Sequence, residues 1–317
     1  MNQDISICVL TENEMGWTEP FELDKVQILD NYYLSAQKSD IAFLKKMDTA
    51  RLLAGFRTTA GIDTKGVRPY GGWEDSLLGG HCVGHYLTAL AQAVKVTGDK
   101  ELKEKSQTLI AGLEECQKKL GTGFLFGAKV EDKEDVEKQF DILEGKKKGE
   151  TWVPWYNMHK VLAGLVDTYK YTGNETALLV AEKLGDWIYE RVSKWDLKTN
   201  QKVLETEYGG MNDCLYELYS YSHNKHHLEA AQKFDEKALF LMAAKGEKNC
   251  LDGKHANTQI PKFIGAIKRY NVLKQLGEAK QEDEAYLVDA EKFFEMVVKR
   301  HSFVTGGISV MEHFRKD

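Results

Sequence analysis

The sequence predicts an all-α protein, an (α/α) barrel built from helical hairpins. Three observations predict this fold class: apolar residues recur at helical spacing, alternation of β-branched residues is scarce, and short turns separate the helical stretches. The 317 residues are 42% hydrophobic, which is enough to bury a large core. We therefore expect one barrel domain over residues 1–317.

Amphipathic stretches indicate the helices. Leu87, Leu90, Ala91 and Val94 fall at positions i, i+3, i+4 and i+7, which places them on one face of a helix. Only four prolines occur, so long helical stretches run without interruption. The same spacing of apolar residues recurs at Leu162, Leu165, Val166 and Tyr169, and again at Ile260, Phe263, Ile264 and Ile267.

Short turns separate the helical stretches. At Gly98-Asp99, glycine can form the left-handed C-cap of one helix, and the following aspartate can cap the next. Turns this short make consecutive helices antiparallel neighbours. Similar turns occur at 171–174, 221–224 and 276–278. Their spacing is longer and less regular than in tetratricopeptide or armadillo repeats, and long loops rich in Trp, Tyr, Gly and His favour a closed ring over an open solenoid.

Charge and cysteine usage exclude several classes of function. The net charge is −6 and no block of basic residues is present, so we expect no nucleic-acid partner. No apolar run is long enough to cross a membrane, and residues 1–5 do not begin a secretory signal. Scattered cysteines without a C-x-x-C pair favour reduced thiols in the cytoplasm over disulfides or a structural zinc site. The five cysteines are Cys8, Cys82, Cys116, Cys214 and Cys250.

Four inter-hairpin segments share aromatic residues, glycine and polar groups just before a helix. They are residues 70–74 with 80–86, then 152–160, 207–213 and 255–261. If the hairpins close into a ring, all four segments lie on one rim. Aromatic faces with convergent imidazole, amide and carboxyl groups suit sugars, so this recurrence indicates a carbohydrate site. The substrate-binding residues that we expect there are Trp73, Glu74, His81, His85, Trp155, Tyr156, His159, Asn212, His255 and Gln259.

Each candidate also has a structural alternative. His81 and His85 lie four residues apart and could share a metal ion, but no third ligand is obvious, so hydrogen-bonding or packing roles are favoured. Cys82 is expected to face elsewhere on the helix as a small core residue. His159 and His255 could each make a structural hydrogen bond, although their matching places in successive hairpins favour function. The aromatic side chains Trp73, Trp155 and Tyr156 could equally be hydrophobic plugs between helix ends.

A Gly-Gly turn near the end of the chain brings a carboxylate, Glu312, into a loop after a long helix. Without other information, a surface charge is the favoured interpretation of that glutamate. The chain ends five residues later at Asp317, directly after a loop, and we therefore expect that the domain is truncated.

Taken together, the segments resemble glycoside hydrolase family 127 and its relative family 146, the β-L-arabinofuranosidase-like group formerly called DUF1680. The resemblance runs nearly end to end, and so many motifs in one order are highly specific. They are Phe21-Glu22-Leu23, Arg51-Leu52-Leu53, Phe56-Arg57, Tyr70-Gly71-Gly72-Trp73-Glu74, Gly80-His81, residues 84–91, Tyr156-Asn157-Met158-His159-Lys160, Gly164-Leu165, Gly209-Gly210-Met211-Asn212, residues 255–262, Thr305-Gly306-Gly307 and Glu312.

The resemblance implies an (α/α)6 barrel followed by β-sandwich domains, which we expect to be absent from this chain. It also implies retaining hydrolysis of β-L-arabinofuranosidic linkages in plant glycans, with an oligosaccharide or glycoside as substrate. Glu312 matches the general acid/base of the G-G-I-x…E-x-F loop, and His159 and His255 match sugar-contacting histidines. Asn212 stands where some members place histidine, which puts the exact sugar in question.

The resemblance further implies a zinc-bound cysteine thiolate as nucleophile, because zinc depresses the pKa of a thiol. The family's E-x-C motif and later cysteine pair are expected after residue 317, so no metal is assigned to this chain and zinc is expected only in a full-length enzyme. We therefore predict that the 317-residue chain alone does not complete hydrolysis. The alternative is a non-catalytic carbohydrate-binding remnant; the order of motifs argues against epimerases or unsaturated-uronide hydrolases.

Overall fold

The computed structural model describes residues 20–130 and 132–316 and confirms the predicted all-α fold class. Within those residues no β-strand forms, and short 3-10 or π turns join some of the α-helices. The helices are α1 (Asn31–Lys46), α2 (Thr49–Thr59), α3 (His81–Thr97), α4 (Lys100–Leu120), α5 (Lys138–Leu143), α6 (Pro154–Thr172), α7 (Glu175–Val192), α8 (Leu197–Leu204), α9 (Met211–Ser222), α10 (Lys225–Gln232), α11 (Lys237–Ala244), α12 (Ala256–Gln275) and α13 (Glu284–Met296).

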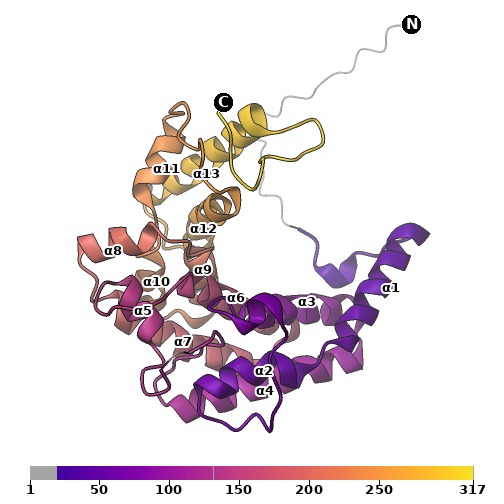
Figure 1. Ribbon diagram of the computed structural model, residues 1–317. Coiled ribbons are helices and arrows are strands. Elements are labelled where there is room, and N and C mark those ends of the chain that lie inside the picture. The colour runs from indigo at the N-terminus through magenta and orange to yellow at the C-terminus, as the bar shows by residue number, and fades with distance from the viewer. Residues whose placement is uncertain (1–19, 131, 317) are drawn as a thin grey trace, which may run out of the picture.

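The helices form two layers, which confirms the predicted (α/α) barrel architecture. Successive inner helices α3, α6, α9 and α12 contact one another, and so do the outer helices α2, α4, α7 and α10. The layers follow an arc, with α1 at one end and α13 with the C-terminal segment at the other (Figure 1). The first residues of the inner helices carry most of the predicted site, so the curvature of the arc determines which of these residues lie close together.

The predicted turns between paired helices are confirmed. Gly98 adopts the left-handed conformation at the end of α3, and the Asp99 carboxylate accepts a hydrogen bond from the Leu102 backbone N–H at the start of α4. Gly173 and Asn174 do the same between α6 and α7. These caps satisfy the free backbone groups at both helix ends within a two-residue connection. As a result, each inner helix runs antiparallel to the outer helix that follows it.

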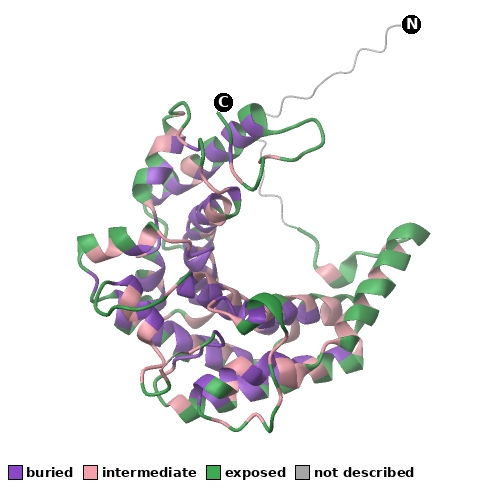
Figure 2. Cartoon of the chain, viewed as in Figure 1, coloured by how far each residue is buried: buried purple, intermediate pink, exposed green. Residues whose placement is uncertain are grey.

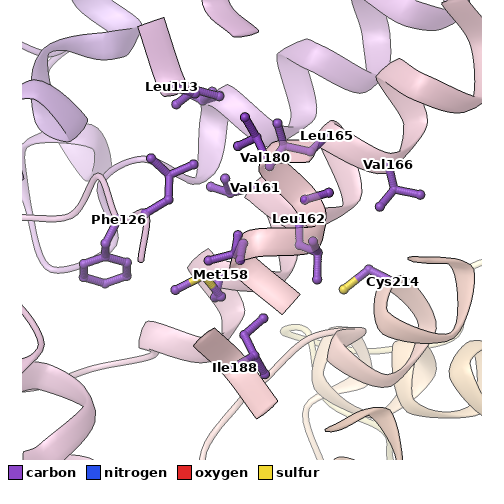
Figure 3. Close-up of a cluster of buried hydrophobic side chains, with 14 of the residues drawn as sticks. Leu113, Phe126, Met158, Val161, Leu162, Leu165, Val166, Val180, Ile188 and Cys214 are labelled. Atoms are coloured by element: carbon purple, nitrogen blue, oxygen red, sulfur yellow. The ribbon is translucent and has the colours of Figure 1, made fainter. Parts of the chain in front are cut away.

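Helix α6 lies at the centre of the main hydrophobic core. Its residues Met158, Leu162 and Leu165 are buried and share one apolar cluster with residues of the neighbouring helices, such as Leu113 and Val180 (Figure 3). Buried residues gather between the two layers, whereas α1 has none (Figure 2). Removing this apolar surface from water is the main force that holds the layers together.

A second core lies between α11, α12 and α13, and the C-terminal segment completes it. Phe314 is fully buried in this cluster beside Phe240, Phe263 and Phe293. The buried aromatic ring therefore anchors the loop that carries the predicted acid/base, Glu312. Among the described residues, no helix combines the length and apolarity that a membrane span requires.

Candidate active site

The loop after α13 is fixed to the segment that precedes α12. The backbone N–H of Ala256 donates to the carbonyl of Glu312 at 2.8 Å, and that of Phe314 donates to the carbonyl of Lys254 at 2.9 Å. An isolated β-bridge pairs His255 with the residue after Glu312. Two segments that are far apart in the sequence thus bring His255 and Glu312 side by side, as the predicted rim requires.

His255 lies between two carboxylates. Its Nε2 atom is 3.7 Å from Oε2 of Glu312, and its Nδ1 atom is 3.8 Å from Oε2 of Glu207. The Thr258 hydroxyl is 2.7 Å from the same Nδ1 atom and orients the ring. The Glu312 side chain is 82% exposed, so a ligand can reach its carboxylate.

The backbone at Glu312 is strained. Met311 and Glu312 have φ angles of +51° and +65°, in the left-handed region that residues other than glycine rarely adopt. Such a conformation costs about 1–3 kcal/mol per residue and persists only where the surroundings impose it. Here the backbone hydrogen bond from Ala256 and the burial of Phe314 impose it. The strain fixes the direction in which the Glu312 side chain leaves the loop.

The start of α3 forms the other part of the site, and Glu74 organises it. One carboxylate oxygen of Glu74 accepts the backbone N–H of Gly80 at 2.9 Å, and the other accepts that of Cys82 at 3.1 Å. The Glu74 carboxylate also lies 2.9 Å from Nδ1 of His81. The three partners outweigh the effect of burial and lower the pKa of Glu74. Glu74 therefore acts as the cap of this helix and as the orienting group of His81.

The structure corrects the predicted orientation of Cys82. Its Sγ atom lies 3.7 Å from Nε2 of His81, whereas the sequence predicted that it would face elsewhere. The bonds from His81 Nδ1 to Glu74 and to the Leu78 carbonyl turn the imidazole so that Nε2 faces the thiol. Burial disfavours the charged imidazole, but hydrogen bonds with Cys82 and Glu74 raise the pKa of His81 to about 10.

Tyr156 connects the two parts of the site. Its ring centroid is 6.5 Å from that of His81, which in turn is 6.5 Å from that of the exposed Trp73. Burial raises the pKa of the Tyr156 phenol, a hydrogen bond with Asn257 opposes the rise, and the charge of Glu207 adds to it. The phenol therefore lies close to the groups that surround His255. Trp73, His81, Tyr156, Glu207, His255 and Glu312 form a continuous series, which we call the rim series.

His159 is held in its neutral form. The backbone N–H of Gly210 donates to its Nδ1 atom at 3.0 Å, so the ring proton is on Nε2. Burial lowers the pKa of His159 well below its ordinary value. Both glycines of the 209–210 turn pack against the ring, because a Cβ atom on Gly209 would be 2.5 Å from Nδ1 and one on Gly210 would be 3.0 Å from Nε2. His159 is thus a hydrogen-bond donor that stays uncharged at neutral pH.

Two further predicted residues lie near this series or beneath it. His85 is exposed on α3, and its ring centroid is 6.2 Å from that of His81, edge to face. Gln259 is buried, with 7% of its surface exposed, in the first turn of α12 after His255. The substrate-binding roles of His85 and Gln259 stay predictions.

Two predicted residues do not face the rim. Trp155 is 1% exposed, and its ring packs against Phe140, Trp195 and Phe234, because the first turn of α6 points this side chain into the core. Asn212 is fully buried, and its amide donates to Asp235 and to the Lys262 carbonyl. Both predictions of sugar contact are corrected: Trp155 is a core residue, and Asn212 joins α9 to α12.

The sequence interpretation did not select Glu207, Asn257 or Cys82 as site residues, although the structure places all three at the site. Each lies within one of the recurring rim segments, and Cys82 directly follows the selected His81. Their position in those segments was the available signal. What the sequence lacked was the side-chain direction, which decides whether a neighbour of a site residue shares the site.

Comparisons with known proteins identify the family of this chain. The family model for the catalytic domain of GH127 β-L-arabinofuranosidase matches residues 25–317. The chain belongs to this family. The predicted resemblance to this family is therefore confirmed.

Solved structures share the fold of this GH127 chain. A GH127 β-L-arabinofuranosidase from Geobacillus stearothermophilus T6 superposes with a TM-score of 0.58 at 16% identity, over 91% of this chain and 47% of its own. The GH127 β-arabinofuranosidase BT3674 superposes with a TM-score of 0.59 at 16% identity, over 92% of this chain and 45% of its own. The chain thus spans less than half the length of either protein. Among curated proteins, its sequence has no significant match.

The residues present do not supply the zinc ligands that the resemblance implies. The 317-residue sequence contains neither the E-x-C motif after Glu312 nor the later cysteine pair. In the part of the chain that the structure describes, the group suited to a metal ion is instead His81 and Cys82 of α3 with Glu74 of the turn that precedes it.

Proposed function

We propose that this GH127 chain forms the sugar-binding rim and the acid/base part of a retaining β-L-arabinofuranosidase that acts on plant-derived glycans. One observation carries the proposal: the exposed carboxylate of Glu312 is held on a strained backbone with Oε2 3.7 Å from Nε2 of His255. The family membership and the likeness to two β-arabinofuranosidases support the choice of sugar. The predicted cytoplasmic location is part of the same proposal.

The proposed chemistry requires two tasks of Glu312. It first gives a proton to the glycosidic oxygen as the C–O bond breaks, and it then takes a proton from the water that completes hydrolysis. His255 positions Glu312, and Glu207 and Thr258 hold the imidazole from the other side. Retention also needs a nucleophile, for which the resemblance implies a zinc-activated cysteine thiolate outside these 317 residues.

The other members of the rim series bind and orient the sugar. The exposed face of Trp73 can stack on the C–H face of a pentose, and Tyr156 offers a phenol beside it. Neutral His159 keeps its proton on Nε2 for donation to a hydroxyl. An uncharged donor suits an uncharged sugar, because no ion has to be desolvated when the ligand binds.

Hydrolysis assays test the division of tasks. The 317-residue chain should bind phenyl β-L-arabinofuranoside and release no phenol from it in plain buffer. Added azide should restore phenol release, because azide can attack the anomeric carbon while Glu312 protonates the departing oxygen. Glu312→Gln should abolish that azide-dependent release, while Glu282→Gln, at an exposed glutamate in the short 3-10 helix before α13, should keep it.

Three outcomes would contradict the proposal. Turnover in buffer alone that disappears in Glu312→Gln would show that this chain contains its own nucleophile. Binding of the arabinofuranoside with azide-dependent release that is equal in Glu312→Gln and wild type would remove the acid/base role. Binding without any release in azide would favour the alternative, a carbohydrate-binding remnant.

A further inference from the structure

Ligand atoms of three chemical kinds lie close together where the Glu74 side chain meets the first turn of α3. One carboxylate oxygen of Glu74, one imidazole nitrogen of His81 and the thiol of Cys82 lie within 4.8 Å of one another. His85 follows one helical turn after His81 on the same face, with its ring edge to face with that of His81 at 6.2 Å. The four side chains form what we call the α3 cluster.

The thiol and the imidazole already have the spacing of two zinc ligands. Zn–S and Zn–N bonds of ordinary length, at a tetrahedral angle, put sulfur and nitrogen about 3.6 Å apart. The distance between Cys82 Sγ and His81 Nε2 is 3.7 Å. An ion could therefore bind both atoms with almost no movement of either side chain. Cys82 is partly exposed, so an ion can reach the pair from solvent.

Glu74 prepares His81 for this role. The Glu74 carboxylate lies 2.9 Å from His81 Nδ1, and the Leu78 carbonyl lies 2.8 Å from the same atom. Two acceptors on Nδ1 hold a proton there, so Nε2, which faces the Cys82 thiol, is the nitrogen that a cation can bind by displacing its proton. A carboxylate behind a zinc-binding histidine is the arrangement that orients such ligands in known zinc sites. Glu74 is fully engaged by the backbone N–H groups of Gly80 and Cys82, so it serves as a positioning residue.

We propose that the α3 cluster is a zinc site, with His81 Nε2, Cys82 Sγ and His85 as the three protein ligands and Glu74 as the positioning carboxylate. The exposed ring of His85 completes the set by rotating about its own side-chain bonds. Three ligands leave the fourth position of a tetrahedral ion for water or for a hydroxyl. The site is separate from the zinc that the family resemblance implies, and it does not depend on arabinofuranoside hydrolysis.

A metal-binding experiment on the 317-residue chain tests this site. The chelator-treated protein is titrated with Zn²⁺ against a zinc indicator dye, and separately with Co²⁺ while its absorption spectrum is recorded. We expect one Zn²⁺ per chain and a thiolate-to-cobalt charge-transfer band with the d–d bands of a tetrahedral ion. Cys82→Ser should remove the band, and Glu74→Gln should weaken zinc binding by about 10–100-fold. Cys250→Ser, at another partly exposed cysteine, should change neither.

The unmodified protein supplies an independent measurement that needs no variant to fold. Alkylation of Cys82 by iodoacetamide, followed by peptide mass spectrometry, should be slowed at least tenfold by equimolar Zn²⁺, while alkylation of Cys250 should not change. Three results would each overturn the site. They are absence of zinc binding, equal zinc binding by Cys82→Ser and Cys250→Ser, and a rate of Cys82 alkylation that Zn²⁺ does not change. The last result would leave Cys82 as a thiol paired only with imidazole.

Discussion

Gly84 of α3 lies directly against the backbone carbonyl of Lys160 in α6. A Cβ atom built on Gly84 would be 1.9 Å from that carbonyl oxygen, and one on Gly164 would be 2.5 Å from the carbonyl oxygen of Gly84. The two inner helices therefore touch through their backbones, which only glycine allows. This crossing also sets how closely the first turns of α3 and α6, with His81 and Tyr156, approach each other.

We predict that Gly84→Ala destabilises the protein by about 3 kcal/mol or more, since the helices must separate to accept one methyl group. Urea unfolding followed by circular dichroism measures the effect. Gly71→Ala is the matched control, because a Cβ atom there meets nothing within 4 Å and its φ is negative. Equal midpoints for the two variants would show that α3 and α6 do not pack this closely.

The two tryptophans of the predicted site should behave in opposite ways. Trp155→Ala empties a core position beside Phe140 and Phe234 and should cost about 3–5 kcal/mol of stability. Trp73 is 66% exposed, so Trp73→Ala should leave the unfolding midpoint nearly unchanged and weaken sugar binding instead. Thermal unfolding of both variants checks this. A larger loss of stability in Trp73→Ala than in Trp155→Ala would reverse the assignment.

Arg269 holds the last inner helix to its neighbours through buried ion pairs. Its guanidinium lies 3.0 Å from Asp235 and 2.7 Å from Asp283, and both carboxylates are buried. Removing the cation would leave two buried acids without compensation, so Arg269→Ala should cost about 3–5 kcal/mol. A change at the exposed Lys198, Lys198→Ala, should cost less than about 0.5 kcal/mol. Similar unfolding midpoints for the two variants would contradict the structural role of Arg269.

The stability of the fold should depend on pH through Asp213. Burial raises the pKa of Asp213 from 3.8 to about 6; Lys268 opposes the rise, and Glu217 adds to it. Because the folded state holds this proton more tightly, the group's contribution to stability is complete below pH 3.8 and is lost as the pH rises through about 6. At neutral pH the ionised carboxylate of Asp213 therefore lowers the stability of the wild type, whereas a neutral amide at this position would not.

Asp213→Asn should consequently gain stability relative to the wild type between pH 4 and pH 7, by about 1–3 kcal/mol. Urea unfolding at both pH values measures the gain. Glu282→Gln, at an exposed carboxylate, should show no such change. A stability difference between Asp213→Asn and the wild type that is the same at both pH values would show that Asp213 titrates normally.

The sequence predicted the parts of the fold that local chemistry decides. Gly98, Gly173 and Asn174 act as helix caps in the structure as they do in the prediction, because a cap depends only on the residues beside it. The direction of a side chain depends on distant residues. The Asn212 amide occupies the space that Gly265, which has no side chain, leaves open. No residue near Asn212 in the sequence indicates this, so the burial of Asn212 was not predictable.

The same limit applies to the site. The motifs located His255 and Glu312, but the contact between them depends on Phe314. This ring is buried in the second core and fixes the loop that carries Glu312. Cys82 was assigned to the wrong face because the position of the His81 ring is set by Glu74, a residue of the preceding loop. Sequence reasoning thus found which segments carry the chemistry, and the tertiary contacts decided which side chains share it.

The central claim is that residues from both parts of the rim series bind one sugar. Titration of methyl β-L-arabinofuranoside into the 317-residue chain, followed by ligand-observed NMR, tests it most directly. We predict that the wild type binds the sugar and that Trp73→Ala and His255→Ala each weaken the affinity about tenfold, a loss of about 1.4 kcal/mol. Absence of binding to the wild type, or equal affinity in all three proteins, would contradict the claim.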